Sequence, residues 1–226
     1  PESNELATAT LRITVKDKDS KKVGRAFSAA VTEMALANYP GFHGAGRPGG
    51  DEDYAVYWPA LVPIDAVEEV VVGPDGKRIP VPHDPEHPDG PAIVLEPRTF
   101  PSPPGGATRR LPLGTVIGAR SGDKGGNANV GLWARSDAGY AWLREYLTLD
   151  RFKSLVGEAK DLEVRRYELP NLRALNFVVV GLLGEGVASS TRMDPQAKSF
   201  GEYVRAKVVD LPIALLEKPL LGTGTS

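Results

Sequence analysis

The stretch Gly118-Ala-Arg-Ser-Gly-Asp-Lys-Gly-Gly-Asn-Ala-Asn-Val-Gly131 lies between two strand-like runs, Leu113 to Ala119 and Asn129 to Arg135. Its glycines allow tight turns and let backbone N–H groups approach a ligand closely. We therefore expect a polar, glycine-rich loop between two strands, with much of the chain's chemistry on it. A turn of purely structural use remains the alternative, because Asn and Gly are ordinary turn residues.

Helix signals follow this loop. Ser136 can cap a helix over Asp137 to Leu147, and Thr148 can cap a second, shorter helix. Further along, Asp194-Pro195 predicts the start of a third helix, with Asp as the N-cap and Pro in the first turn. The three helices should bury the apolar residues that recur at helical spacing. Those expected to face inward include Trp142, Phe200 and Val204.

Two more strand-like runs complete the second half, Leu162 to Leu169 and Leu175 to Leu183. The second is apolar along most of its length, which indicates a central strand. The resulting order, β-β-α-(α)-β-β-α, predicts an α+β sandwich. In it, one mainly antiparallel sheet carries its helices on one face.

The first half carries weaker signals. Alternation predicts a strand at Leu11 to Val15, and helical spacing predicts a helix from about Ser20 to Ala37 with Ser20 as a possible N-cap. A short aromatic strand is expected within Tyr54 to Val62. The turn Pro74-Asp75-Gly76-Lys77 predicts a hairpin between the flanking apolar runs.

A proline-rich connector is expected between the halves. The segment from Pro80 to Pro104 holds nine of the 20 prolines, which fix φ and remove N–H donors. Ala92 to Leu95 can still add one strand. We therefore predict two parts, residues 1–105 and 106–226, with an exposed linker at the end of the first.

Composition excludes several classes of protein. The chain has 226 residues, of which 41% are hydrophobic and 25% charged, as in ordinary globular proteins. A net charge of −2 argues against nucleic acid as the main partner. No apolar run approaches the ~18 residues of a membrane span. Cys is absent, which excludes disulfides and thiol chemistry. We expect a cytoplasmic protein with no membrane partner and no cofactor.

The glycine-rich loop supplies the leading candidate site. Lys124 can bind a carboxylate or phosphate, and Asp123 can hold that Lys or act as a general base. We expect Asp123 and Lys124 to be the catalytic residues, as an acid/base or anchoring pair. Arg120 offers a bidentate fork for a carboxylate. No helix follows the loop and its Gly–Lys spacing differs from a P-loop, so a Walker A motif is excluded. The other expected ligand-binding residues of the loop are Ser121, Gly122, Gly125, Gly126, Asn127 and Asn129.

A second polar segment runs from Gly184 to Asp194 into the expected last helix. Helix N-termini bind anions, and Ser190 and Arg192 can add donors. Asn176 lies within an apolar strand, so its amide needs a partner if it is buried. Each of these has a structural alternative, a plain capped loop for the segment and bridging of backbone groups for Asn176.

The histidine residues give no strong indication of a metal site or a catalytic triad. All three His residues lie before the expected boundary, and the run from His83 to Asp89 contains Pro85 and Pro88, which break any helix that would align two His side chains. We expect a solvated linker there and no metal site. A Ser-His-Asp triad would have to cross between the halves, which disfavours Ser121 or Ser190 as a nucleophile.

Several of these motifs resemble the acyclic terpene utilisation protein A (AtuA) family. The resemblance rests on Arg120 to Gly131, Pro170 to Phe177 and Gly184 to Asp194, which are similar to the family's small C-terminal module, described as ferredoxin-like. Ala35 to Phe42 and Tyr57 to Pro63 are similar to the end of the larger domain that precedes it. The resemblance covers nearly the whole chain and implies a ferredoxin-like sandwich preceded by a partial α/β segment.

The resemblance also implies a metabolic setting. Pathways that degrade acyclic terpenes pass through acyl-CoA thioesters, so we expect a small acidic metabolite, such as an acyl-CoA or a branched carboxylate, as the partner. Family members are usually much longer at the N-terminus, and the first residue here is Pro1. Part of the larger domain is therefore expected to be missing. The alternative function is a non-catalytic assembly module that packs on the missing domain or forms a homo-oligomer.

Overall fold

The computed structural model describes residues 2–37, 39–46, 49–82 and 98–216. It divides into two compact units, residues 1–55 and 56–226. The expected boundary near residue 105 remains a prediction. Most of the proline-rich connector, with the histidine run and the expected strand at Ala92 to Leu95, lies outside the described residues. Among the described residues, no helix is long and apolar enough to cross a bilayer.

The first unit is helical where it is regular. It contains α1 (Asn4–Ala7), α2 (Ser20–Val23), α3 (Arg25–Glu33) and the 3-10 helix η1 (Met34–Leu36). The expected single helix is thus divided at Gly24, and its first cap is Asp19, whose side chain accepts from the Lys21 N–H at 3.0 Å.

One expected strand of this unit is absent. Residues Leu11 to Val15 form no strand and are exposed. A strand needs a neighbouring strand for its backbone hydrogen bonds, and the described residues of the first unit contain none. Alternation alone was therefore an insufficient signal.

The second unit begins with a short irregular segment and a hairpin. The expected aromatic strand at Tyr54 to Val62 is absent, and the 3-10 helix η2 (Ile64–Ala66) follows it. Strands β1 (Glu69–Val72) and β2 (Arg78–Val81) then pair antiparallel, as the turn residues predict. The Gly73 N–H donates to the Lys77 carbonyl at 2.9 Å and closes the turn.

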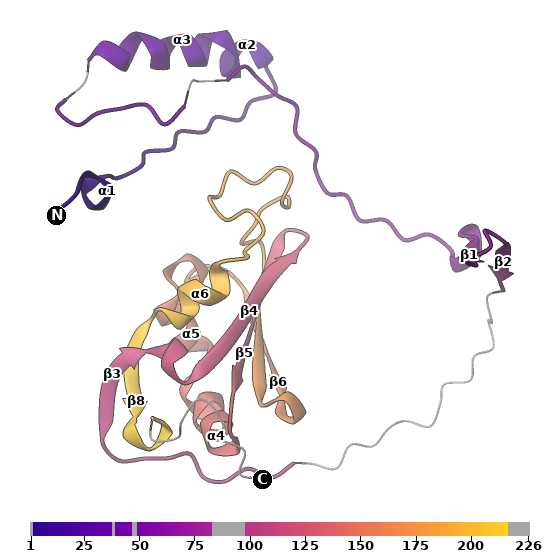
Figure 1. The fold of residues 1–226 in the computed structure, drawn as a ribbon, viewed down its shortest axis with the longest axis vertical. Coiled ribbons are helices and arrows are strands. Elements are labelled where there is room, and N and C mark those ends of the chain that lie inside the picture. The colour runs from indigo at the N-terminus through magenta and orange to yellow at the C-terminus, as the bar shows by residue number, and fades with distance from the viewer. Residues whose placement is uncertain (1, 38, 47–48, 83–97, 217–226) are drawn as a thin grey trace. The chain divides into compact units, whose positions relative to one another are not determined.

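A four-stranded antiparallel sheet forms the body of the second unit (Figure 1). Its order is β4-β5-β7-β6, and each neighbouring pair is antiparallel. The prediction of an α+β fold with one mainly antiparallel sheet is confirmed. The strands are β4 (Ile117–Lys124), β5 (Asn127–Ala134), β6 (Val164–Leu169) and β7 (Ala174–Val179).

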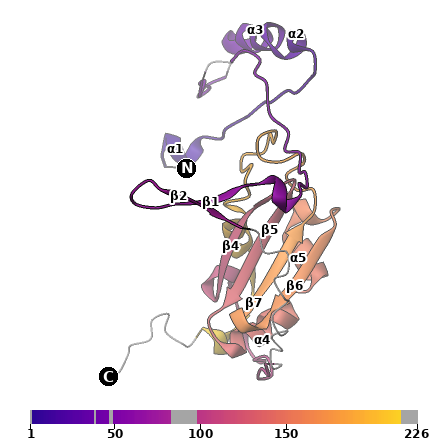
Figure 2. The same cartoon turned by 90° about the vertical axis from the view of Figure 1, so that its right-hand side faces the viewer.

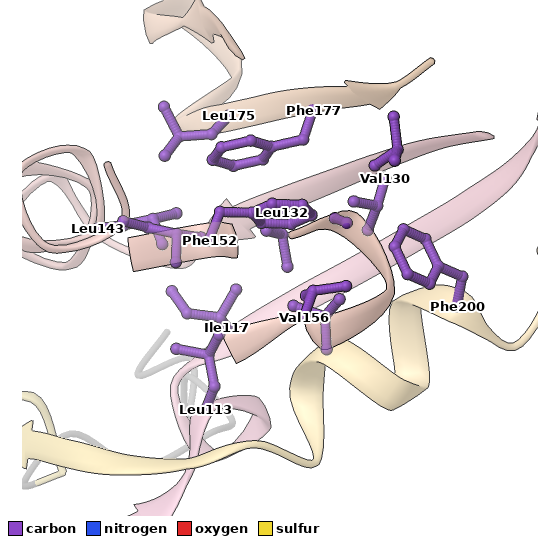
Figure 3. Packing of buried hydrophobic residues seen from close by; sticks show 14 of the residues in the cluster. Leu113, Ile117, Val130, Leu132, Leu143, Phe152, Val156, Leu175, Phe177 and Phe200 are labelled. Carbon is purple, nitrogen blue, oxygen red and sulfur yellow. The ribbon is translucent and has the colours of Figure 1, made fainter. Parts of the chain in front are cut away.

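The helices of this unit pack on one face of the sheet. They are α4 (Asp137–Tyr146), α5 (Leu149–Leu155) and α6 (Phe200–Arg205). The Ser136 and Thr148 hydroxyls cap the first two, as expected. Figure 3 shows side chains of the helices and the sheet meeting in one apolar cluster. In it, the rings of Phe152 and Phe177 stack with centroids 4.2 Å apart. The predicted inward residues Trp142, Phe200 and Val204 are all buried.

The glycine-rich stretch differs from its expected form. It is strand over nearly its whole length, because β4 continues to Lys124 and β5 begins at Asn127. Gly125 and Gly126 alone make the turn, and Gly125 has a φ of 61°, which favours glycine. The segment from Leu113 to Thr115, expected as strand, is the 3-10 helix η3. The polar residues therefore lie on a hairpin with alternating faces rather than on a loop.

The last helix also differs. It begins at Phe200, several residues after Asp194-Pro195. The Asp194 carboxylate accepts from the N–H groups of Lys198 and Ser199 at 2.8 and 2.9 Å, so it organises the turn before the helix rather than its first turn. Two short strands that were not predicted, β3 (Thr108–Pro112) and β8 (Val208–Pro212), pair antiparallel as a separate ribbon. The remaining 3-10 helices are η4 (Gly157–Ala159), η5 (Pro170–Leu172) and η6 (Ile213–Leu215).

Candidate functional site

The β4–β5 turn is joined to the loop that follows β7. The Leu183 N–H donates to the Gly126 carbonyl at 2.9 Å. The Gly181 N–H donates to the Asn127 side-chain oxygen at 2.8 Å. Two segments that are more than fifty residues apart in the sequence are thus held together by hydrogen bonds. Both were predicted to take part in a site, and their glycines permit this close approach.

A cavity of about 470 Å³ lies where these segments meet. We call it the hairpin-end cavity. Gly125 and Gly186, which both have positive φ, line it, and the Tyr57 side chain lies close to both. A Cβ at Gly125 would stand 3.5 Å from Tyr57 Cε1, and one at Gly186 would stand 3.3 Å from Tyr57 Cβ. The complete lining is Tyr57, Asp123, Lys124, Gly125, Gly186 and Val187.

Asp123 and Lys124 are the charged groups of this lining. Lys124 is exposed and its Nζ donates to the Asp123 carbonyl at 2.9 Å. Asp123 is half-buried. An ammonium group near glycine backbone suits an anionic ligand, and a neighbouring carboxylate can accept a proton or a hydrogen bond from it. Their roles as an anchoring or acid/base pair remain a prediction.

Other predicted residues lie on the sheet face opposite the helices, which Figure 2 shows with the helices behind it. Strand alternation places Arg120 and Gly122 of β4 on this face, with Asn129 of β5 and Asn176 of β7. The Asn129 amide nitrogen donates to the Asn176 side-chain oxygen at 3.2 Å. Asn176 thus bridges to another side chain, and not to backbone groups.

Ser121 points the other way, towards α6. Its Oγ donates to the Ala197 carbonyl at 2.6 Å and accepts from the Gly201 N–H at 2.7 Å. The hydroxyl thereby fastens the start of α6 to β4. Both its hydrogen and an acceptor site are used inside the protein, which gives Ser121 a structural role in this arrangement.

Ser190 and Arg192 make contacts within the protein. The Ser190 hydroxyl accepts from the Arg192 N–H at 3.3 Å. The Arg192 guanidinium pairs with Glu158 at 2.5 Å, which ties the loop to η4. The structure therefore places these two residues in contacts that hold the loop, and neither of them lines the hairpin-end cavity.

Asp194 lies at the end of the second glycine-rich segment, and its titration is perturbed. Burial raises its pKa, but the hydrogen bonds from the Ser199 hydroxyl and from the N–H groups of Lys198 and Ser199 outweigh burial. The net effect holds the pKa of Asp194 below its ordinary value. The ionised form is therefore part of the folded structure.

Sequence reasoning missed several residues of the site. Tyr57 and Val187 line the cavity, and Lys198 brings its Nζ to 3.5 Å from the position of a Cβ on Gly122. Tyr57 stands in the motif Tyr57 to Pro63, so its conspicuous aromatic and proline content was the available signal. Val187 stands within the segment Gly184 to Asp194, which was the available signal for it, whereas Lys198 carried none. Within the described residues, no group of three His, Asp or Glu side chains is placed to hold a metal ion.

Comparison with known families gives two matches along the chain. Residues 111–210 match the AtuA ferredoxin-like domain. Residues 1–72 match the acyclic terpene utilisation family protein AtuA. No curated protein and no solved structure matches the chain. The first match spans the whole four-stranded sheet and both glycine-rich segments of the site. The chain therefore belongs to the AtuA family, which is associated with acyclic terpene utilisation.

Proposed function

We propose that this chain binds a small acidic metabolite of acyclic terpene catabolism, a branched carboxylate or its acyl-CoA thioester, in the hairpin-end cavity. A cytoplasmic location is part of the same proposal. The observation that carries it is the meeting of Lys124 with the glycine backbones of two separate segments around one cavity. Its volume of about 470 Å³ lies within the ~300–1,000 Å³ that small-molecule sites occupy.

The cavity offers both halves of such a ligand a suitable surface. The Lys124 ammonium can hold a carboxylate or a thioester oxygen with a charge-assisted hydrogen bond. Tyr57 and Val187 offer apolar contact to a branched aliphatic chain. Asp123 can accept a hydrogen bond from a ligand hydroxyl, or a proton from the bound metabolite. Because charged groups and apolar surface line the same cavity, an amphipathic acid should bind better than a purely polar one.

Binding should depend on the charge of the ligand and of Lys124. We would titrate short branched carboxylates and their acyl-CoA thioesters into the protein by calorimetry, with the matching amides as uncharged ligands. Lys124→Gln removes the charge and keeps most of the length. Lys160→Gln is the matched control, because Lys160 is also exposed and directly follows η4, outside the cavity lining.

We expect Lys124→Gln to weaken carboxylate binding roughly 10- to 150-fold, the range of a charge-assisted hydrogen bond. The control variant should bind as the parent does. Equal binding of acids and amides, or equal binding by Lys124→Gln and the parent, would contradict the proposal.

The exposed apolar side chains of residues 1–72 favour a second candidate, an assembly module. Among the described residues of this range, Gly24 alone is buried. Leu36, Trp58 and Leu61 are 92%, 85% and 103% exposed. Large apolar side chains left in water in such number usually mark contact sites. In this reading, the range packs on another subunit.

Light scattering coupled to size exclusion tests the assembly reading directly. A dimer or larger oligomer that dissociates on Trp58→Ser, with Trp133→Ser as the control, would favour it. A monomer at every concentration, with ligand binding intact, would leave the metabolite site as the function.

A further inference from the structure

The sheet face opposite the helices carries a row of residues in direct register. Arg120 pairs with Gly131, Gly131 with Asn176, and Asn176 with Tyr167. The neighbouring row begins with Gly122 opposite Asn129. We call these residues the open face. Gly122 and Gly131 contribute no side chains to this face, and Gly122 is itself buried. Polar side chains stand around them. The open face comprises Arg120, Gly122, Asn129, Gly131, Tyr167 and Asn176.

The open face is positively charged. Arg120 is exposed, and the Lys198 ammonium reaches over the edge strand to Gly122, 3.5 Å from where its Cβ would stand. Within the described strands β4, β5 and β7, no Asp or Glu alternates onto this face. On β6, Arg165 is already paired with Glu163 at 2.7 Å. Two cations therefore stand on this face, and no carboxylate of these three strands lies among them.

The amide pair adds a hydrogen-bonding edge. The bond from Asn129 to Asn176 uses one donor and one acceptor. A carbonyl oxygen of Asn129 and N–H groups of Asn176 remain, and no partner for them lies within the described part of the chain. A donor and an acceptor side by side complement the edge of a nucleobase.

An aromatic ring stands at the end of the same row. Tyr167 is 47% exposed and lies in direct register with Asn176. Exposed aromatic rings on a sheet are platforms on which bases stack, and each stacked base contributes substantially to binding. The open face thus combines three recognition elements of a nucleotide: cations for phosphate, an amide edge for the base and a ring for stacking.

We propose that the open face binds the adenosine phosphate end of an acyl-CoA whose acyl end occupies the hairpin-end cavity. This inference rests on the proposed function. Lys124 connects the two places, because it lines the cavity and also alternates onto the same side of β4 as Arg120. Arg120 lies four positions before Lys124 on β4, which corresponds to about 13 Å along the strand. The flexible arm of the coenzyme would follow β4 over that distance.

The test compares parts of the ligand. Calorimetry would measure the binding of coenzyme A, adenosine bisphosphate and a branched acyl-pantetheine, which lacks the nucleotide. Arg120→Gln is the test variant, and Arg109→Gln is the control, since Arg109 is also exposed but lies on β3. Tyr167→Ala is a second test variant. Circular dichroism establishes that each variant is folded.

We expect Arg120→Gln to weaken the binding of coenzyme A and of adenosine bisphosphate roughly 10- to 150-fold. The binding of acyl-pantetheine should not change. Tyr167→Ala should weaken the binding of the same two ligands. If acyl-pantetheine binds and adenosine bisphosphate does not, this inference fails and the proposed function stands. If neither binds and the free branched carboxylate does not bind either, both fail. Tighter binding of a single-stranded RNA than of coenzyme A would also overturn the assignment.

Discussion

The carbonyl oxygen of Gly184 lies so close to Gly126 that a Cβ on Gly126 would stand 2.1 Å from it. Real side chains do not tolerate such a contact with backbone. The β4–β5 turn and the loop after β7 therefore meet backbone to backbone, and the hydrogen bond from Leu183 to Gly126 closes the contact. The hairpin-end cavity exists because this contact sets the spacing of the two segments.

Gly126→Ala should destabilise the protein, because either the turn or the loop must move. The expected loss is about 1–3 kcal/mol in the free energy of unfolding, the usual cost of overpacking. Urea unfolding followed by circular dichroism measures it. Gly157→Ala is the control, since nothing lies within 4 Å of its Cβ position and its φ is not positive. Equal stability of Gly126→Ala and the parent would show that the two segments do not touch.

Ser121→Ala should also destabilise the protein. It leaves the Gly201 N–H and the Ala197 carbonyl without the hydroxyl that joins them. An unmet hydrogen bond of a partly buried group costs about 1–3 kcal/mol. Thermal unfolding measures the difference, with the exposed Ser102→Ala as control. A loss of ligand binding with unchanged stability would instead assign Ser121 to the ligand.

The hydrogen bonds to Asp194 make the free energy of unfolding depend on pH. Its pKa in the folded chain is below the unfolded value of about 3.9. The ionised carboxylate therefore stabilises the fold above that value, and the contribution is lost as the pH falls through the lower, folded pKa. Asp194→Asn should lower stability by about 1 kcal/mol at pH 7. Urea unfolding between pH 7 and about pH 2.5 should show the two proteins converging in acid, whereas a constant difference would contradict this assignment.

Asp123→Asn separates the two charged groups of the cavity. Removing a negative charge beside Lys124 should strengthen carboxylate binding about two- to fivefold, as expected for a partly exposed pair of like charges. If the protein turns over an acyl thioester, turnover should fall while binding persists, which marks a general base. Calorimetry and a thioester assay measure the two effects. Unfolding of Asp123→Asn would show that the carboxylate holds the hairpin instead.

Much of the second unit could be predicted from the sequence. The Ser136 and Thr148 caps and the apolar spacing of the helices after them depend on neighbouring residues alone, and the structure has both helices there. The sheet and the inward position of Trp142 followed from the same local periodicity. The isolated strand at Leu11 to Val15 failed because strand formation needs a partner that alternation does not reveal.

Some features of the candidate site could likewise be predicted from the sequence, and others depend on tertiary contacts. Sequence alone identified the two glycine-rich segments and their charged residues, since glycine and ionisable side chains are visible in the chain itself. It could not assign their faces, because a strand reverses its side chains at every residue, and the glycine content of this polar stretch predicts a loop rather than strands. Only the register of β4, β5 and β7 turned Ser121 towards α6 and Arg120 towards the open face. Only long-range packing brought Gly186 and Tyr57 to Lys124, because contacts between distant segments depend on the whole fold and leave no local pattern.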